Sequence, residues 1–242
     1  MGEITGLPST RWARDEEYNT PFYKQVTQEM IKIHADTGGG KRDPKGDHQF
    51  ASLYADGLYW SRQWEYPWAI ESAELVRPDG HPIDDIEEMK VLDVGCGTAP
   101  FLVYLGQMGC QAYGSDPGST PDEEKIDGFW AIFNPDFGKP YITELRQEGM
   151  QALSWPDNYF DRVFCHSVIE HLPLEKVRAG VWHMKRVLKP GGLLVMTVDS
   201  GLMKDAIIEA AAMPFYGGVD DLGILPSTHY PYLILAMVFQ KG

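Results

Sequence analysis

Residues 91–100 read VLDVGCGTAP, and this stretch decides the fold that the sequence predicts. Its first four residues form a short apolar strand that carries Asp93 and runs into two glycines. Residues 100–108 then show the apolar spacing of a helix. Ligands bind at the carboxyl ends of the strands in an open parallel sheet. Gly95 and Gly97 would let a ligand approach the backbone closely, so we expect a binding site at this turn.

The chain continues to alternate between strands and helices after this turn. We expect a helix at 174–188 and strands at 111–115, before 148, at 162–168, at 193–198 and at 233–239. Such alternation is typical of βαβ units and a parallel sheet. The unbroken apolar strands indicate that both faces of the sheet are covered. The last strand follows a stretch rich in Pro and Gly rather than a clear helix, which favours an antiparallel orientation.

The first 88 residues differ from this α/β part. They contain a predicted short helix at 21–34, a break rich in Gly and charge at 36–47, and an aromatic-dense stretch at 50–68. Within that stretch, Pro67 is typical of a first helical position, so we expect a helix from there to about Leu75. A further helix start is expected at 120–123, where TPDE forms a capping box.

Length, composition and charge narrow the classes of function that this sequence can have. The length of 242 residues suits one domain with additions, and the net charge of −14 disfavours nucleic acid and anionic membranes as partners. The three cysteines occur in stretches expected to be core and do not form a disulfide framework. The first residues lack the apolar region of a signal peptide, and the longest apolar run is too short for a membrane helix. We expect a soluble, cytoplasmic protein.

Two nucleotide-binding alternatives fit less well. A dinucleotide fingerprint requires a third glycine three residues after the second, where this chain has Pro100, and no P-loop Lys-Ser or Lys-Thr follows the glycines. Asp116 ends the second strand, 23 residues after Asp93. An acid at about this spacing suits the hydroxyl groups of a ribose, although Asp116 could simply open an Asp-Pro-Gly turn.

Four consecutive motifs carry a resemblance: VLDVGCGTAP, YGSDPG, SWPDNYFDRVFCHSVIEHLP and LKPGGLLVMTVD. Together they resemble the class I S-adenosylmethionine (SAM)-dependent methyltransferases of the small-molecule type. The resemblance implies an α/β fold, a three-layer Rossmann-like sandwich with a mostly parallel seven-stranded sheet and an antiparallel last strand. Residues 89–242 would form this SAM-binding core, and residues 1–88 a helical cap or lid that contributes to an acceptor pocket.

The resemblance also implies where SAM, and its product S-adenosylhomocysteine, would bind. Asp93, Gly95, Cys96 and Gly97 would flank the amino-acid end of SAM, and Asp116 with Pro117 would hold the ribose. The adenine would lie against Gly149, Met150 and Gln151, and His166 and Ser167 would lie beneath the cofactor. Gly149 departs from the pattern, because the family often has an Asp there. Glu148 or the backbone of Met150 could substitute for it.

Three histidines are candidate general bases: His166 at a strand end, His171 in IEHL, and His229 near the last strand. For any one histidine, a packed or capping role is the more common outcome. The aromatic stretch could supply a lid over the methyl group, with Tyr54, Trp60, Arg62, Trp64 and Tyr66 as substrate-side residues, or it could simply pack on the sheet. Arg62 could meet the SAM carboxylate or pair with Glu65 on a surface. No metal site is expected, because no ligand cluster has convincing spacing.

The function predicted from these observations is direct methyl transfer from SAM to an O, N, S or C nucleophile of a small molecule. A SAM-binding protein without turnover that acts as a partner or regulator stays open as an alternative, as does a nicotinamide-dependent oxidoreductase. The sequence leaves the oligomeric state open, including a homodimer.

Overall fold

The computed structural model describes residues 11–12, 19–36, 54–55, 58–59, 62–97, 100–118, 140–198 and 235–242, and positions 207, 209 and 211. Within these ranges no helix combines the length and the apolar character needed to cross a membrane. The expected capping box at 120–123 lies outside the described residues.

One sheet organises the chain, with strand order β1-β9-β8-β7-β4-β5-β6. The five strands from β8 to β6 are parallel, β9 is antiparallel to β8, and the two-residue β1 is antiparallel to β9. The antiparallel last strand is therefore confirmed. The seventh strand of this sheet comes from the start of the chain. The strands are β1 (Arg11–Trp12), β4 (Lys90–Val94), β5 (Gln111–Ser115), β6 (Ile142–Arg146), β7 (Phe160–His166), β8 (Leu188–Val198) and β9 (Leu235–Gln240).

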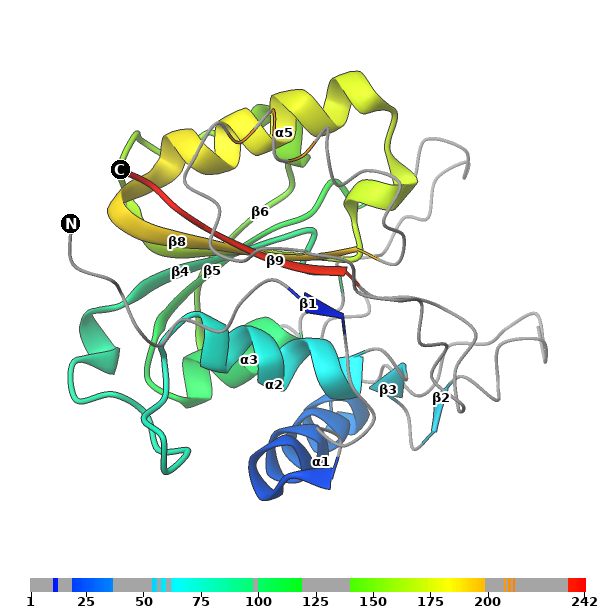
Figure 1. Ribbon diagram of the computed structural model, residues 1–242, viewed down its shortest axis with the longest axis vertical. Helices are drawn as coiled ribbons and strands as arrows, with labels where there is room; N and C mark the ends of the chain where they lie inside the picture. The colour runs from blue at the N-terminus through cyan, green and yellow to red at the C-terminus, as the bar shows by residue number, and fades with distance from the viewer. Residues whose placement is uncertain are drawn as a thin grey trace.

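Helices cover the two faces of this sheet and make three layers. Figure 1 shows α1, α2 and α3 on one face and α5 on the other. The helices are α1 (Pro21–Asp36), α2 (Arg62–Ser72), α3 (Pro100–Gln107) and α5 (Leu174–Val187), with short 3-10 turns η4 (Ile86–Glu88), η5 (Met150–Ala152) and η6 (Ile169–His171). The strands β2 (Tyr54–Ala55) and β3 (Leu58–Tyr59) pair apart from the main sheet.

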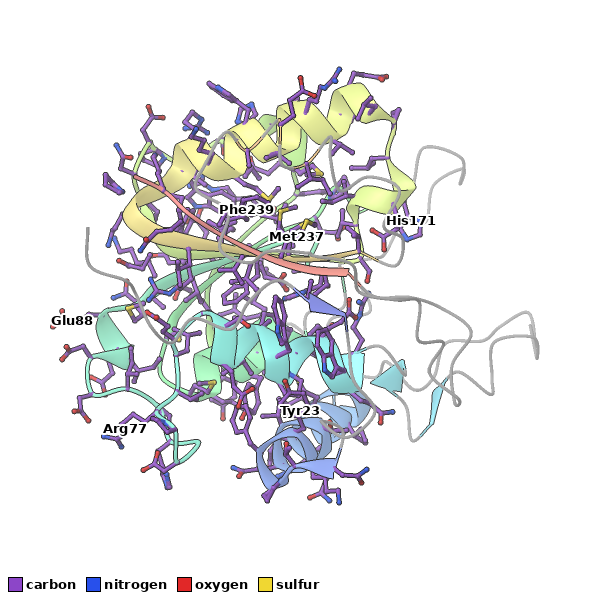
Figure 2. The ribbon with its side chains drawn as sticks, in the orientation of Figure 1. Tyr23, Arg77, Glu88, His171, Met237 and Phe239 are labelled. Atoms are coloured by element: carbon purple, nitrogen blue, oxygen red, sulfur yellow. The ribbon has the colours of Figure 1, made fainter. Side chains whose placement is uncertain are left out.

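Alternate residues of each strand fill two apolar cores. Val91 and Phe164 pack with α1, α2 and α3, whereas Leu92 packs with α5. Figure 2 shows Met237 and Phe239 of β9 on the α5 side, where both belong to the second core. The three cysteines are buried and free, as the sequence indicates. Because helices cover both faces of the parallel part of the sheet, a ligand would bind at the ends of its strands.

Most expected elements are confirmed, but the start of α2 is a correction. The helix begins at Arg62 rather than at Pro67, so Pro67 lies inside it. A proline has no amide hydrogen to donate to the carbonyl four residues earlier. That carbonyl, on Gln63, instead accepts a hydrogen bond of 3.3 Å from the Thr27 hydroxyl of α1. The contact between the two helices thus compensates for the interior proline.

The boundaries of β7 are a second correction. The strand spans Phe160–His166, two residues earlier than expected. Ser167 has a φ of +47°, which ends the extended backbone, and Val168 precedes the 3-10 turn η6. The strand therefore ends at His166, and the following residues turn across the sheet edge.

The first testable prediction concerns Gly95, which has a φ of +77° and whose added Cβ would lie 2.4 Å from Cγ2 of Val168. We expect Gly95→Ala to lower the free energy of unfolding by about 2–4 kcal/mol, because backbone strain and overpacking add. Gly191→Ala is the matched control, since Gly191 has the same φ of +77° and no neighbour within 4 Å. Gly191→Ala should lower the free energy of unfolding by about 1–2 kcal/mol, because it adds backbone strain without overpacking. Urea denaturation of both variants measures the difference, and equal losses would contradict the packing argument.

Candidate functional site

The first part of the site is the turn after β4. Gly95 and Gly97 have φ values of +77° and +55°. The amides of Gly95 and Cys96 donate to the carbonyl of Ser115, at 2.7 and 3.1 Å. These bonds hold the turn against the end of β5. The glycine-rich backbone therefore lies at the carboxyl edge of the sheet, as the sequence predicts.

Asp116 follows β5 and is bound to this turn. One carboxylate oxygen accepts from the Gly97 amide at 3.0 Å, and the other accepts from the Gly118 amide at 2.8 Å. Burial raises the pKa of Asp116, and the two amides oppose that rise. A carboxylate has about four lone-pair sites, so Asp116 retains acceptor capacity toward a ligand.

The loop after β6 forms the next part of the same edge. The side chain of Gln147 donates to the carbonyl of Pro117 at 3.3 Å, which connects this loop to the Asp116 turn. Gly149 precedes η5, in which Met150 is buried and Gln151 is exposed.

Glu148 in this loop is hydrogen-bonded to Ser154. Its carboxylate accepts from the Ser154 amide at 3.0 Å and from the Ser154 hydroxyl at 2.7 Å. A carboxylate that accepts two hydrogen bonds retains acceptor capacity, so the Glu148 side chain and the backbone of Met150 both remain proposed substitutes for the Asp absent at Gly149.

A network centred on Glu65 joins α2 to the ends of β7 and β8. Glu65 is fully buried, and its carboxylate accepts from Arg62, from the Ser167 hydroxyl at 2.9 Å and from the Thr197 hydroxyl at 2.5 Å. Arg62 also donates to Ser167 at 2.8 Å. Of the two roles that the sequence left open for Arg62, the pair with Glu65 is present, but Glu65 lies in the core rather than on a surface.

His166 is attached to the same network. Its Nδ1 atom lies 3.1 Å from the Thr197 hydroxyl oxygen, whereas its buried Nε2 atom has no hydrogen-bond partner among the described residues. The rings of Tyr66, Phe101 and Phe164 surround the imidazole, with centroids 4.9 to 5.9 Å away. Burial lowers the pKa of His166 to about 3, so the ring is neutral at ordinary pH.

Asp93 is the second buried carboxyl group of the site. It ends up 4% exposed near the end of β4. Burial raises the pKa of Asp93 to about 7, the positive charge of Arg62 opposes the rise, and the negative charge of Asp116 adds to it. The protonation of Asp93 therefore changes within the physiological range.

The structure places the remaining predicted residues as follows. Trp64 is fully buried and stacks on Trp68 at 5.4 Å, which favours the packing interpretation of this side chain. His171 is exposed at the end of η6, and Figure 2 shows it at the periphery of the molecule. Tyr54 lies in β2, but its side chain is outside the described set, as are Trp60 and His229.

Sequence reasoning did not assign a role in the site to Glu65 or Thr197. Thr197 lies within the apolar strand LLVMTV and gives no separate signal. Glu65 lies among tryptophans, and a charged residue in a segment otherwise typical of core is the one hint of a buried role.

The comparisons with known proteins agree with this geometry. Residues 92–196 match the sequence profile of a family described as "Methyltransferase domain". The resemblance to methyltransferases that the motifs carry is thereby confirmed.

Curated relatives are similar to this chain over more than half of its length. The ubiquinone biosynthesis O-methyltransferase of mouse mitochondria is 31% identical over 76% of this chain and 49% of its own length. The ubiquinone biosynthesis O-methyltransferase of Rhizobium rhizogenes is 26% identical over 61% of this chain and 54% of its own length. The chain thus spans about half the length of these relatives.

Solved structures share the fold. A geranyl diphosphate methyltransferase has a TM-score of 0.55 and 14% identity, and the alignment covers 92% of this chain and all of that one. The 1,6-didemethyltoxoflavin-N1-methyltransferase of Burkholderia thailandensis has a TM-score of 0.52 and 13% identity over 98% and 94% of the two chains. This chain therefore shares the overall fold of these two solved structures.

The second prediction concerns the titration of Asp93. Its raised pKa means that the folded state binds this proton more tightly than the unfolded chain does. The stability that the group contributes is present below about pH 4 and is lost as the pH rises through about 7. Carboxyl-detected NMR should show a group titrating near pH 7 that disappears in Asp93→Asn.

Arg62→Met should raise the pKa of Asp93 further, because the opposing positive charge is removed. Arg77→Met, which changes an exposed ion pair with Asp84, is the matched control and should leave it unchanged. A pKa of Asp93 near 4, or no response to Arg62→Met, would contradict the electrostatic description.

Proposed function

We propose that this protein is a SAM-dependent methyltransferase that transfers a methyl group by direct displacement to a nucleophile of a small molecule. The observation that carries the proposal is the bond between the Gly97 amide and the Asp116 carboxylate. It brings a glycine-rich turn and an acceptor for ribose hydroxyls together at the carboxyl edge of a parallel sheet, where such folds bind nucleotides.

The described residues suit each part of SAM. Asp116 keeps acceptor capacity for the two ribose hydroxyls. Gly95 carries no side chain, and Val168 leaves no room for one, so no side chain at this position covers the backbone of the turn. The amino-acid end of SAM carries an ammonium and a carboxylate. Asp93 and Arg62, which interact electrostatically, offer the opposite charges at the end of β4. The loop from Gly149 to Gln151 remains the proposed adenine contact.

When bound, SAM supplies an electrophilic methyl group on a positively charged sulfur. The protein's own residues then need to position the acceptor in line and to exclude water, and such positioning can supply much of the rate. The buried face of α2, with Tyr66 over His166, closes one side of this edge. Residues 1–88 would extend this covering as a cap and contribute to the acceptor pocket.

A general base is needed only if the acceptor must lose a proton early. His166 is a weak base, because burial lowers its pKa to about 3. His171 and His229 stay as proposals for this role. The acceptor is proposed to be a small molecule, since the net charge of −14 opposes polyanions and the curated relatives are named as O-methyltransferases of ubiquinone biosynthesis.

The third prediction tests SAM recognition. In calorimetric titrations, the wild type should bind SAM and S-adenosylhomocysteine at micromolar concentration and should not bind NAD. Asp116→Ala should weaken both adenosyl ligands by about 1–3 kcal/mol, since it removes a partly buried hydrogen-bond acceptor. Asp84→Ala is the matched control, because the Asp84 side chain is 87% exposed and should not affect binding.

Binding of NAD alone would reject the proposal in favour of an oxidoreductase. Unchanged affinity in a folded Asp116→Ala variant would remove the ribose assignment. After SAM binding is established, transfer of a labelled methyl group to a panel of small hydroxyl, amine and thiol compounds distinguishes an enzyme from a SAM-binding partner without turnover.

A further inference from the structure

The direction of one hydrogen bond in the Glu65 network follows from chemistry. Thr197 has a single hydroxyl proton and two polar neighbours, with Glu65 Oε1 at 2.5 Å and His166 Nδ1 at 3.1 Å. Arg62 and Ser167 also donate to the Glu65 carboxylate. An ionised carboxylate can only accept. Thr197 therefore donates to Glu65 and must accept from His166.

This direction fixes the tautomer of His166. A neutral imidazole carries one N–H, and the bond to Thr197 requires that it sit on Nδ1. The Nε2 atom is then a bare acceptor. In water the opposite tautomer of histidine prevails, so the protein selects the less common form. Burial lowers the pKa of His166, so the ring stays neutral and carries a single N–H, the one on Nδ1.

The Nε2 atom lacks a donor within the described part of the chain. It is buried, and of the three aromatic rings around the imidazole only that of Tyr66 carries a hydroxyl, which makes no hydrogen bond to Nε2. A buried acceptor without a partner is unfavourable, and a ligand that supplies a donor removes the penalty. His166 is the last residue of β7, at the edge where the proposed ligand binds.

The order of the strands indicates which part of SAM lies near this atom. Along the sheet β7 is next to β4, while β5 and β6 follow on the other side of β4. The ribose and adenine are proposed to lie at the ends of β5 and β6, which leaves the amino-acid end beside β7. Of its two charged groups only the ammonium can donate.

We propose that Glu65 is a positioning residue that acts through Thr197 to hold His166 with its proton on Nδ1, so that Nε2 accepts a hydrogen bond from the ammonium group of SAM. The ligand half of this inference rests on the proposed function. The tautomer half does not, because it concerns the protein without ligand.

The first experiment measures the tautomer directly. Long-range ¹H–¹⁵N NMR of histidine-labelled protein distinguishes a protonated Nδ1 from a protonated Nε2, and His166→Gln assigns the resonances among the seven histidines. We expect the wild type to show a protonated Nδ1 at pH 7. Thr197→Val, which removes the hydroxyl and keeps the shape, should shift the proton to Nε2. Thr197→Ser keeps the hydroxyl and should retain the wild-type pattern.

The second experiment measures ligand affinity by calorimetry with the same variants. S-adenosylhomocysteine carries the ammonium, whereas 5′-deoxy-5′-methylthioadenosine lacks the amino-acid end. Thr197→Val should weaken S-adenosylhomocysteine about tenfold, which corresponds to one lost hydrogen bond to a charged donor, and should leave methylthioadenosine unchanged. Thr197→Ser should bind both ligands like the wild type.

The outcomes separate the two proposals. A protonated Nε2 in the wild type overturns the positioning role of Glu65. A protonated Nδ1 with equal S-adenosylhomocysteine affinity in Thr197→Val overturns the ammonium contact. Failure of the wild type to bind either adenosyl ligand overturns the proposed function and the ammonium contact, while the NMR result still decides the tautomer. If Thr197→Val does not fold, Glu65→Gln replaces it in both measurements.

Discussion

The buried carboxylate of Glu65 is the interaction on which the binding edge depends. It receives hydrogen bonds from Arg62 on its own helix, from Ser167 after β7 and from Thr197 in β8. Removing one partner of a buried ion pair typically costs about 3–5 kcal/mol, because the remaining charge is left in a low-dielectric interior. The helix α2 is therefore held in one position relative to the strand ends. Its interior proline is tolerated because Thr27 of α1 supplies the donor that Pro67 lacks.

The same constraint sets the electrostatics of the site. The contacts of Arg62 with Glu65 and Ser167 hold its charge where it opposes the burial of Asp93, so the pKa of Asp93 rises only to about 7. Asp116 is held separately, by the amides of Gly97 and Gly118. The edge thus carries two acidic groups and one guanidinium in a fixed arrangement, which is the basis for proposing a ligand with an ammonium, a carboxylate and a ribose.

The sequence predicts the parts of this arrangement that are local. The strand before Gly95, the strand that ends just before Asp116 and the antiparallel last strand are all confirmed, since apolar runs and glycines report directly on backbone conformation. The start of α2 is not predictable in the same way. Nearly every side of this helix is buried, so no amphipathic period marks it. The contact between Glu65 and Thr197 spans 132 residues of sequence, and only the folded chain brings the two together.

The most direct test of the account is a crystal structure of the protein with S-adenosylhomocysteine bound. We expect the ribose hydroxyls within hydrogen-bond distance of the Asp116 carboxylate and the ammonium nitrogen within hydrogen-bond distance of His166 Nε2. A ligand seated away from the carboxyl ends of β4 and β5, or one whose ribose does not contact Asp116, would contradict it.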